Sequence, residues 1–334
     1  MQRPHPLPAI AVGLLALASC GVEGEIPADA EAPAAAATSP REARPEITPE
    51  HGFPAKVRSF TGDVVLLEAP PRRIIAGNAS VLDGLAALVE PERIAALPDT
   101  ALRYSLLAED PGGFGELPRL ESFEAEAILA PRPDLVLVHG YQRGTTVDRV
   151  LERGVPLVVL PAVTSWTDTL EGLRTLARLV GEEERGARLV DDLEERRRRL
   201  QEPAVRSGLT VLPYGNYGAG GSTAGAGTTW QVMIELAGMR NAATEAGLVG
   251  HPGIDFEQIL AIQPDFFLVG DGADGETGSA ETVLRAEAAL GSLEAVREGR
   301  FLRLPEALYS TSSHHVLTAA EALAAQAEAL LAGE

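Results

Sequence analysis

The chain has 334 residues, and 45% of them are hydrophobic, which is typical of a globular protein and not of a disordered one. This chain is longer than a domain with a single hydrophobic core usually is, so two domains are expected. The formal net charge of −20 argues against nucleic acid as a partner, because so acidic a chain would not neutralise phosphates, and equally against a basic membrane-binding surface.

Residues 1–20 have the pattern of an export signal. Arg3 supplies a short positive start, and residues 9–18 form an apolar run too short to span a bilayer as a stable helix. The run leads into Leu17-Ala18-Ser19-Cys20, which resembles the lipobox of bacterial lipoproteins. This resemblance implies cleavage before Cys20 and lipidation of Cys20. The alternative is an ordinary secretory signal with an incidental cysteine.

Residues 21–54 are rich in Ala, Pro and Glu and show no hydrophobic period, which predicts a disordered tether. Because Cys20 is the only cysteine, the mature protein has no internal disulfide. We therefore expect an exported protein that faces the periplasm or the exterior. A lipid anchor would hold it to the cell membrane, and the rest of the chain would be soluble.

Residues 55–181 predict a first lobe in which strands and helices alternate. Asn78 or Ser80 is expected to cap a helix at 81–89, and Ser165 and Gly181 to begin and end a helix at 166–180. This order predicts an α/β fold with a mostly parallel sheet covered on both faces. The predicted strands are 64–67, 73–76, 93–96, 135–138 and 157–160, and the other predicted helices are 126–130 and 145–153.

Residues 182–201 predict one long helix. Its first turn is acidic, its last turn is basic, and its apolar stripe is narrow, so most of it should face water. We interpret it as a rigid strut that joins two lobes; one more surface helix is the alternative. Residues 202–334 then predict a second α/β lobe with a Gly-rich loop at 214–227. Its predicted strands are 209–213, 266–269 and 301–304, and its predicted helices are 228–237, 254–261, 280–289 and 316–331.

One motif occurs in both halves of the chain. Residues 126–138 and 257–269 both read E-x-I-L-A-x-x-P-D-x-x-L-V, and every position of the second copy follows the first by 131 residues. Each copy predicts a short helix, a proline that ends it, and a buried strand. A repeat at this spacing indicates two copies of one lobe design rather than a solenoid.

The chain resembles the substrate-binding lipoproteins of bacterial ABC importers for ferric siderophores, haem and vitamin B12, the class III periplasmic binding proteins. The resemblance covers about residues 57–331 and rests on PPRRIIAGNAS, the repeated motif, GVPLVVLP, the long helix and GAGTTWQVMIELAGMRNA. It implies two Rossmann-like lobes with mostly parallel sheets, joined by one long helix, with a ligand cleft between them. It also implies a monomer that carries a transported ligand and has neither catalytic residues nor a cofactor of its own.

The resemblance further implies a partner, the permease dimer of an ABC importer. In this family one exposed glutamate on each lobe docks onto permease arginines, and Glu126 and Glu257 match that pattern. Paired acidic groups on two lobes would give steering and register more than affinity. The structural alternative is that each glutamate lies at a helix N-terminus because the helix dipole favours it there.

Ligands of parallel sheets bind beyond the carboxyl ends of the strands, and the tyrosines fall in or beside the predicted loops. Aromatic walls suit a large, flat, partly apolar ligand such as a corrin, a porphyrin or a catecholate chelate. His139, Tyr141, Tyr309 and His314 are also residue types that bind haem iron. The predicted ligand-binding residues are Asn78, Ser80, Tyr104, Tyr141, Trp166, Tyr214, Tyr217, Tyr309 and His314.

Two other classes are considered. A zinc- or manganese-binding lipoprotein would need several of His139, His251, His314 and Asp271 to converge. A secreted α/β hydrolase would need a nucleophile elbow, but residues 221–225 read G-S-T-A-G and not G-x-S-x-G. The same loop also lacks the G-K-[ST] of a phosphate-binding P-loop.

Overall fold

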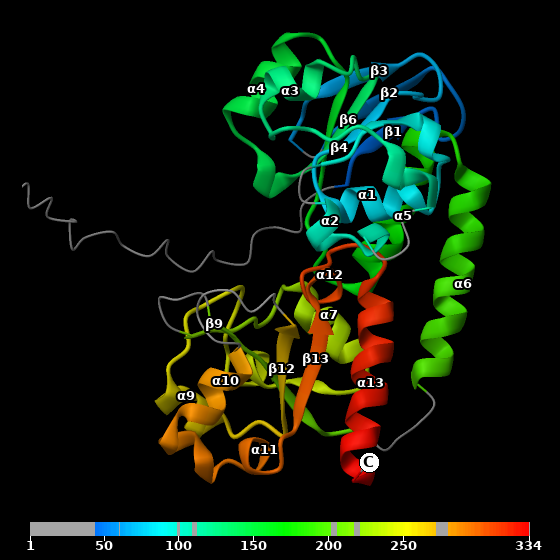
Figure 1. Ribbon diagram of the computed structural model, residues 1–334. Coiled ribbons are helices and arrows are strands. Elements are labelled where there is room, and N and C mark those ends of the chain that lie inside the picture. The colour runs from blue at the N-terminus through cyan, green and yellow to red at the C-terminus, as the bar shows by residue number, and fades with distance from the viewer. Residues whose placement is uncertain are drawn as a thin grey trace, which may run out of the picture. The chain divides into compact units, whose positions relative to one another are not determined.

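Two four-stranded sheets form the framework (Figure 1). The strands of one precede the long helix α6 (Glu183–Gln201) in the sequence, and the strands of the other follow it. The computed structural model describes residues 44–59, 61–98, 101–108, 112–201, 206–216, 221–271 and 280–333. These described residues all belong to one compact unit. The predicted signal peptide with Cys20, the tether up to residue 43, and Tyr217 lie outside the described residues.

The two sheets have the same topology. All strand pairs in both are parallel, with the order β5-β4-β6-β7 in the N-terminal lobe and β11-β8-β12-β13 in the C-terminal lobe. Each order places the second strand of its lobe at one edge, followed by the first, third and fourth. The predicted fold, two α/β lobes with parallel sheets, is confirmed.

The elements of the N-terminal lobe alternate as predicted. Three of its four strands, β4, β6 and β7, are buried along their whole length, as expected for a sheet covered by helices on both faces. The sheet and its helices are β4 (Ile74–Ala76), α1 (Ala79–Ala86), β5 (Ile94–Ala96), α2 (Ala101–Tyr104), α3 (Ala125–Leu129), β6 (Leu135–His139), α4 (Thr145–Glu152), β7 (Leu157–Leu160) and α5 (Trp166–Val180). Short 3-10 turns lie at η1 (Pro91–Arg93), η2 (Leu106–Ala108), η3 (Gly112–Glu116) and η4 (Gly140–Gln142).

The C-terminal lobe begins after α6 (Glu183–Gln201). Its sheet comprises β8 (Thr210–Pro213), β11 (Arg240–Asn241), β12 (Phe266–Asp271) and β13 (Phe301–Pro305), and the two-residue strands β9 (Gly215–Asn216) and β10 (Gly221–Ser222) form a separate hairpin. Its helices are α7 (Thr229–Leu236), α8 (Ala242–Glu245), α9 (Phe256–Ile262), α10 (Ala280–Ala286), α11 (Glu294–Arg297), α12 (Glu306–Tyr309) and α13 (Val316–Ala332), with a 3-10 turn at η6 (Ala288–Ser292).

Side chains cap the helices where the sequence predicts it. The Asn78 side chain accepts a hydrogen bond from the Val81 N–H at the start of α1, so Asn78 and not Ser80 is the N-cap. Ser165 accepts from the Asp168 N–H at the start of α5. Gly181 ends that helix with φ 72°, the left-handed conformation that glycine adopts without strain.

The repeated motif builds the same unit in both lobes. Helix α3 leads into β6, and α9 leads into β12, and each of these strands is the third of its lobe. Arg132 and Gln263 lie at corresponding positions before the prolines, and both adopt a left-handed backbone with φ 52° and 51°. The two copies therefore match in backbone conformation as well as in residue type.

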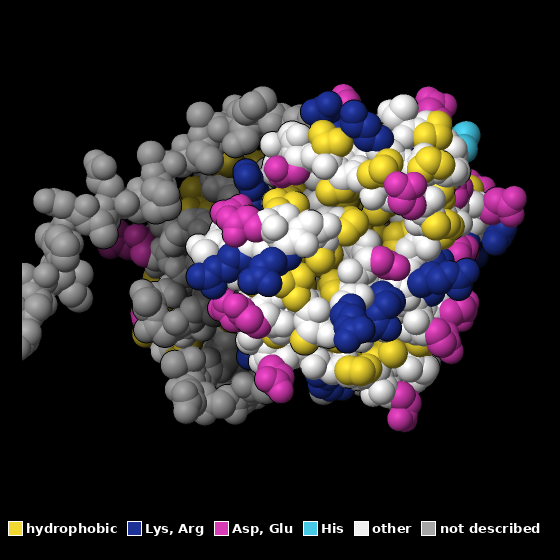
Figure 2. Space-filling view, turned by 90° about the horizontal axis from the view of Figure 1, so that it is seen from above, with side chains coloured by type: hydrophobic (Ala, Val, Ile, Leu, Met, Phe, Trp, Pro, Cys, Tyr) yellow, Lys and Arg dark blue, Asp and Glu magenta, His cyan; other side chains and the backbone are white. Residues whose placement is uncertain are grey.

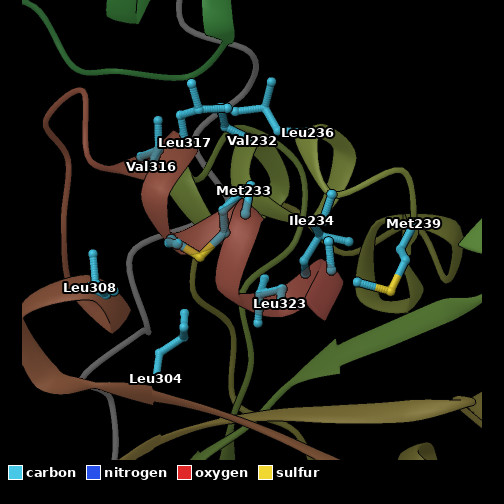
Figure 3. Packing of buried hydrophobic residues seen from close by; sticks show 14 of the residues in the cluster. Val232, Met233, Ile234, Leu236, Met239, Leu304, Leu308, Val316, Leu317 and Leu323 are labelled. Atoms are coloured by element: carbon cyan, nitrogen blue, oxygen red, sulfur yellow. The ribbon is translucent and has the colours of Figure 1, made fainter. Parts of the chain in front are cut away.

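The main core of the C-terminal lobe lies between its sheet and helices α7 and α13. Figure 3 shows Met233 and Ile234 of α7 beside Leu323 of α13, with Leu304 at the end of β13. Leu170 and Leu173 of α5 also belong to this core. The second half of α5 packs into the N-terminal core instead, so the helix assigned by sequence to the N-terminal lobe contributes to both cores.

Helix α6 packs antiparallel to α5 and is held at both ends by arginines. Near its start, Arg185 donates to the Ala87 carbonyl at 2.9 Å and pairs with Glu90 at 2.8 Å. Near its end, Arg196 pairs with Glu321 of α13 at 2.6 Å. The predicted strut is therefore braced by contacts with both lobes, and Figure 1 shows it running from one lobe to the other beside α13.

A small antiparallel sheet precedes the first lobe. It pairs β1 (Glu46–Thr48) with β2 (Ala55–Arg58) and β2 with β3 (Val64–Leu67). The prediction of a disordered tether up to residue 54 is wrong from β1 onward, because Ile47 and Phe53 pack against the N-terminal core. A three-residue strand with one apolar side chain is too short to show a period. Within the described residues no helix is long and apolar enough to cross a bilayer.

Candidate functional site

The loops after β4 and β6 meet at the carboxyl end of the N-terminal sheet. Gln142 joins them, since its Nε2 donates to the Gly77 carbonyl at 2.7 Å and its Oε1 accepts from the Asn78 side chain at 2.6 Å and from the His139 N–H at 3.1 Å. A Cβ at Gly77 would lie 2.8 Å from a methyl group of Val138, so only glycine allows this close approach. The N-terminal half of the site is thus a fixed loop pair.

His139 and Tyr141 lie on the loop that follows β6. Their rings lie edge to face with centroids 5.8 Å apart. His139 is 7% exposed, and burial lowers its pKa to about 4, so its imidazole is neutral near pH 7. Tyr141 is 71% exposed. Of the two, Tyr141 is the group that a ligand can reach without rearrangement.

An aromatic pocket lies at the corresponding end of the C-terminal sheet. Its volume is about 310 Å³, and it is lined by Pro213, Ser222, Thr223, Ala224, Trp230, His251 and Tyr309. Trp230 is its centre: the ring of His251 lies edge to face with it at 5.1 Å and the ring of Tyr309 at 5.3 Å. Burial lowers the pKa of His251, which favours the neutral imidazole that can bind a metal.

Two of the predicted tyrosines are largely core residues. Tyr214 is 1% exposed and belongs to a hydrophobic core cluster, so it presents almost no surface to a ligand in this conformation. Tyr309 is 6% exposed, and its hydroxyl donates to the Tyr214 carbonyl at 3.4 Å. Tyr309 still contributes to the pocket wall through its contact with Trp230.

The remaining predicted residues are dispersed. Trp166 donates from Nε1 to Glu194 of α6 at 3.1 Å and packs against the C-terminal core, so it joins α5 to α6. Tyr104 is half-buried, with the guanidinium carbon of Arg103 5.1 Å from its ring centroid. His314 is 7% exposed.

Ser80 links the lobes directly, because its hydroxyl accepts the Ser312 N–H at 3.0 Å. The structure therefore brings Asn78 and Tyr141 together in one lobe and Tyr309 with the aromatic pocket in the other.

Sequence reasoning did not assign Trp230 to the site and considered His251 only as a zinc ligand. The available signal was the position of Trp230 in the first turn of α7, directly after the Gly-rich loop.

The described residues contain no group of three or more His, Cys, Asp or Glu side chains that could hold a metal ion. His139, His251, His314 and Asp271, which the zinc or manganese alternative requires, are all described and do not converge into such a group.

The family description "Periplasmic binding protein" matches residues 74–308, which is more than half of the chain. The chain belongs to the periplasmic binding protein family. This confirms the predicted resemblance. It also means that the chain is an extracytoplasmic solute-binding protein and not an enzyme, with a transported ligand in place of a cofactor.

Relatives of this binding protein span most of both lobes. A cobalamin-binding protein of Halobacterium salinarum is 24% identical over 249 residues, which is 74% of this chain and 67% of the relative. The haem-binding protein RhuT from Roseiflexus sp. RS-1, in its apo form, is 25% identical with a TM-score of 0.66 and covers 77% of this chain and 99% of its own. An ABC-type Fe3+-hydroxamate transport protein from Saccharomonospora viridis has 22% identity and a TM-score of 0.67, over 82% and 99% of the two chains.

Proposed function

We propose that this periplasmic binding protein is anchored to the membrane by lipid at Cys20, captures a metal chelate and delivers it to the permease dimer of an ABC importer. The chelate class is haem, a corrinoid or a ferric siderophore. The family and its fold support capture of such a solute. The lipobox-like Leu17–Cys20 sequence supports the anchor, and the need for only one pair of lobes per transporter supports a monomer.

The size and walls of the aromatic pocket indicate which of the three ligand classes fits best. At about 310 Å³ it lies at the lower end of the range for small-molecule sites, so it accommodates one edge of a large ligand and not the whole of it. Its walls are aromatic edges, which suit a flat apolar ring system. Among the three chelate classes this favours a tetrapyrrole, and the names of the cobalamin-binding relative and of the haem-binding structure agree with that preference.

Tyr141 and His251 are the proposed metal-contacting groups. Tyrosine and histidine both serve as axial ligands of haem iron. Tyr141 is 71% exposed, and His251 is exposed at the pocket, whereas His139 and His314 are each 7% exposed. Asn78 and Ser80, at the N-terminus of α1, supply nearby polar groups on the N-terminal lobe.

Delivery rests on the paired glutamates. Glu126 and Glu257 are exposed in the first turns of α3 and α9, the equivalent helices of the two lobes. Figure 2 shows side chains of both charge signs interspersed with apolar ones on the face that it presents. Paired acidic groups, one on each lobe, give docking onto a permease steering and register more than affinity.

A binding panel tests the proposal. The full chain is mixed separately with haem, cobalamin, a ferric hydroxamate and zinc, and thermal unfolding and visible absorbance are recorded. A ligand at 100 times its Kd stabilises the protein by about 2.7 kcal/mol. We expect haem or cobalamin to do so, and Tyr141→Phe or His251→Ala to weaken binding and shift the absorbance band of a ligated metal.

Exposed Tyr141 has a buried counterpart in Tyr214, and Tyr214→Phe serves as the matched control that leaves the absorbance band unchanged. If no chelate shifts the melting temperature, the proposed function is wrong. If only the hydroxamate does, the chelate class stands and the preference for a tetrapyrrole is wrong.

A further inference from the structure

A buried carboxyl group lies where the two lobes touch. Asp83 of α1 is 2% exposed, and one of its oxygens accepts a hydrogen bond from the Ser105 hydroxyl. Its other oxygen lies 3.5 Å from the hydroxyl of Ser313, which belongs to the C-terminal lobe. One turn earlier on the same helix, Ser80 accepts the Ser312 N–H at 3.0 Å. Helix α1 thus holds residues 312 and 313 by two adjacent contacts.

The loop that α1 holds is ordered by its own polar groups. The hydroxyl groups of Thr311 and Ser313 are 2.9 Å apart, and the Ser313 hydroxyl also accepts the His315 N–H at 3.2 Å. The loop connects α12, which carries Tyr309 of the aromatic pocket, to α13, the main core helix of the lobe. A change at this loop therefore reaches both the pocket and the C-terminal core.

We propose that Asp83 is a proton-controlled catch between the lobes: the neutral carboxyl group holds loop 311–315 against α1, and its ionisation releases that loop. A neutral carboxyl group can be buried in this site without the cost of desolvating a charge. The carboxylate accepts from the same two hydroxyl groups, those of Ser105 and Ser313, but it would carry a full charge in a site where these partners are neutral. Water could stabilise that charge only if the loop moved away.

The carboxyl group of Asp83 changes its protonation state near pH 7. Burial raises the pKa of Asp83 to about 7, and hydrogen bonds from Ser105, Ser313 and the Leu106 N–H offset only part of that rise. The two histidines on the loop do not titrate there, because burial lowers the pKa of His314 to about 3 and of His315 to about 4, with Arg196 adding to both shifts. Near pH 7 the carboxyl group is the one of these three groups that changes charge.

The other titratable groups around α1 lie on the elements that pack against it. These are Arg103 and Tyr104 on α2, His139 at the end of β6, and Asp168, Glu171, Arg174 and Arg178 on α5. Burial and hydrogen bonds account for the raised pKa of Asp83, with no ion pair to any of these groups among its causes. The catch is therefore set by desolvation and not by a neighbouring charge.

Hydrogen–deuterium exchange of the full, ligand-free chain tests the catch. Peptides that cover residues 310–316 are followed at pH about 6 and about 8, after correction for the intrinsic pH dependence of exchange. With a pKa of about 7, the ionised fraction rises about tenfold across this range, so we expect the corrected exchange of the loop to rise by up to about tenfold. Asp83→Asn should remove this rise, and the exposed Asp191→Asn should keep it.

Ser313→Ala keeps the carboxyl group of Asp83 and removes only its partner across the lobes. It should raise the exchange of the loop at both pH values and keep the ratio between them, because burial and not the hydrogen bond from Ser313 raises the pKa of Asp83. The proposal is overturned if the corrected exchange of the wild-type loop does not change with pH, or if Asp83→Asn retains the wild-type ratio. Because no ligand is added, neither outcome depends on the proposed function.

Discussion

Asp134 and Asp265 hold the first strand of their respective lobes in the same way. Asp134 accepts the N–H groups of Arg72 and Arg73, just before β4, at 2.8 and 2.9 Å. Asp265 accepts both the N–H and the hydroxyl of Thr210, the first residue of β8, at 2.8 Å. Each aspartate belongs to the Pro-Asp of the repeated motif, so the motif ties the third strand of a lobe to the start of its first strand.

Replacing these aspartates should destabilise the protein unequally. Asp265 is partly buried and Asp134 is exposed, so water replaces the lost acceptor more easily at Asp134. We expect Asp265→Ala to lower the free energy of unfolding by about 1–2 kcal/mol and Asp134→Ala by about 0.5–1 kcal/mol. Urea denaturation measures both, with the exposed Asp148→Ala as control. An equal or larger loss at Asp134 would contradict this explanation.

Two glycines of the α5–α6 hairpin should respond to alanine in opposite directions. A Cβ at Gly186 would lie 2.4 Å from the Cβ of Ala177 on the facing helix, whereas a Cβ at Gly172 would meet no atom within 4 Å. We expect Gly186→Ala to destabilise by about 1–3 kcal/mol through overpacking, and Gly172→Ala to stabilise by about 0.5–1 kcal/mol through helix propensity. The melting temperatures of the two variants should move in opposite directions, and a shared direction would show that the helices repack freely.

The buried histidines should make the protein acid-sensitive. Burial lowers the pKa of His314 from 6.5 to about 3, so the unfolded chain binds this proton first as the pH falls. The stabilisation is complete above pH 6.5 and is lost as the pH falls toward 3, with a slope of about 1.4 kcal/mol per pH unit for one group. Denaturation at several pH values between about 5 and 6 should show a flatter slope for His314→Gln than for the wild type. Parallel slopes would mean that His314 protonates without unfolding.

The paired glutamates should affect transport and not ligand capture. Glu126 and Glu257 are exposed and neither lines the aromatic pocket, so the double Ala variant should keep its ligand affinity while uptake is abolished. Cellular uptake of the bound chelate and the Kd of the purified protein are measured together. Glu152→Ala, which removes a neighbouring acid near Glu126, is the matched control and should retain uptake. Normal uptake by the double variant would refute the docking role.

The sequence by itself determined the local elements, the repeat and the class of fold. Burial of β6, the Ser165 cap and the Gly181 stop were predictable, and the cap of α1 was narrowed to Asn78 or Ser80, because these features depend on sterics and hydrogen bonds between residues a few positions apart. The copy of residues 126–138 at 257–269 was sufficient to predict two lobes of one design, and the shared strand order agrees with it.

Only the tertiary structure decided which side chains meet. The sequence placed Tyr214 in a loop, but the chain folds that loop over the core and leaves the ring 1% exposed. His251 and Trp230 form one pocket because the segments that follow β8 and β11 converge, and Asp83 is buried because a loop 230 residues later in the chain covers it. Such contacts depend on the path of the whole backbone, and no local pattern encodes that path.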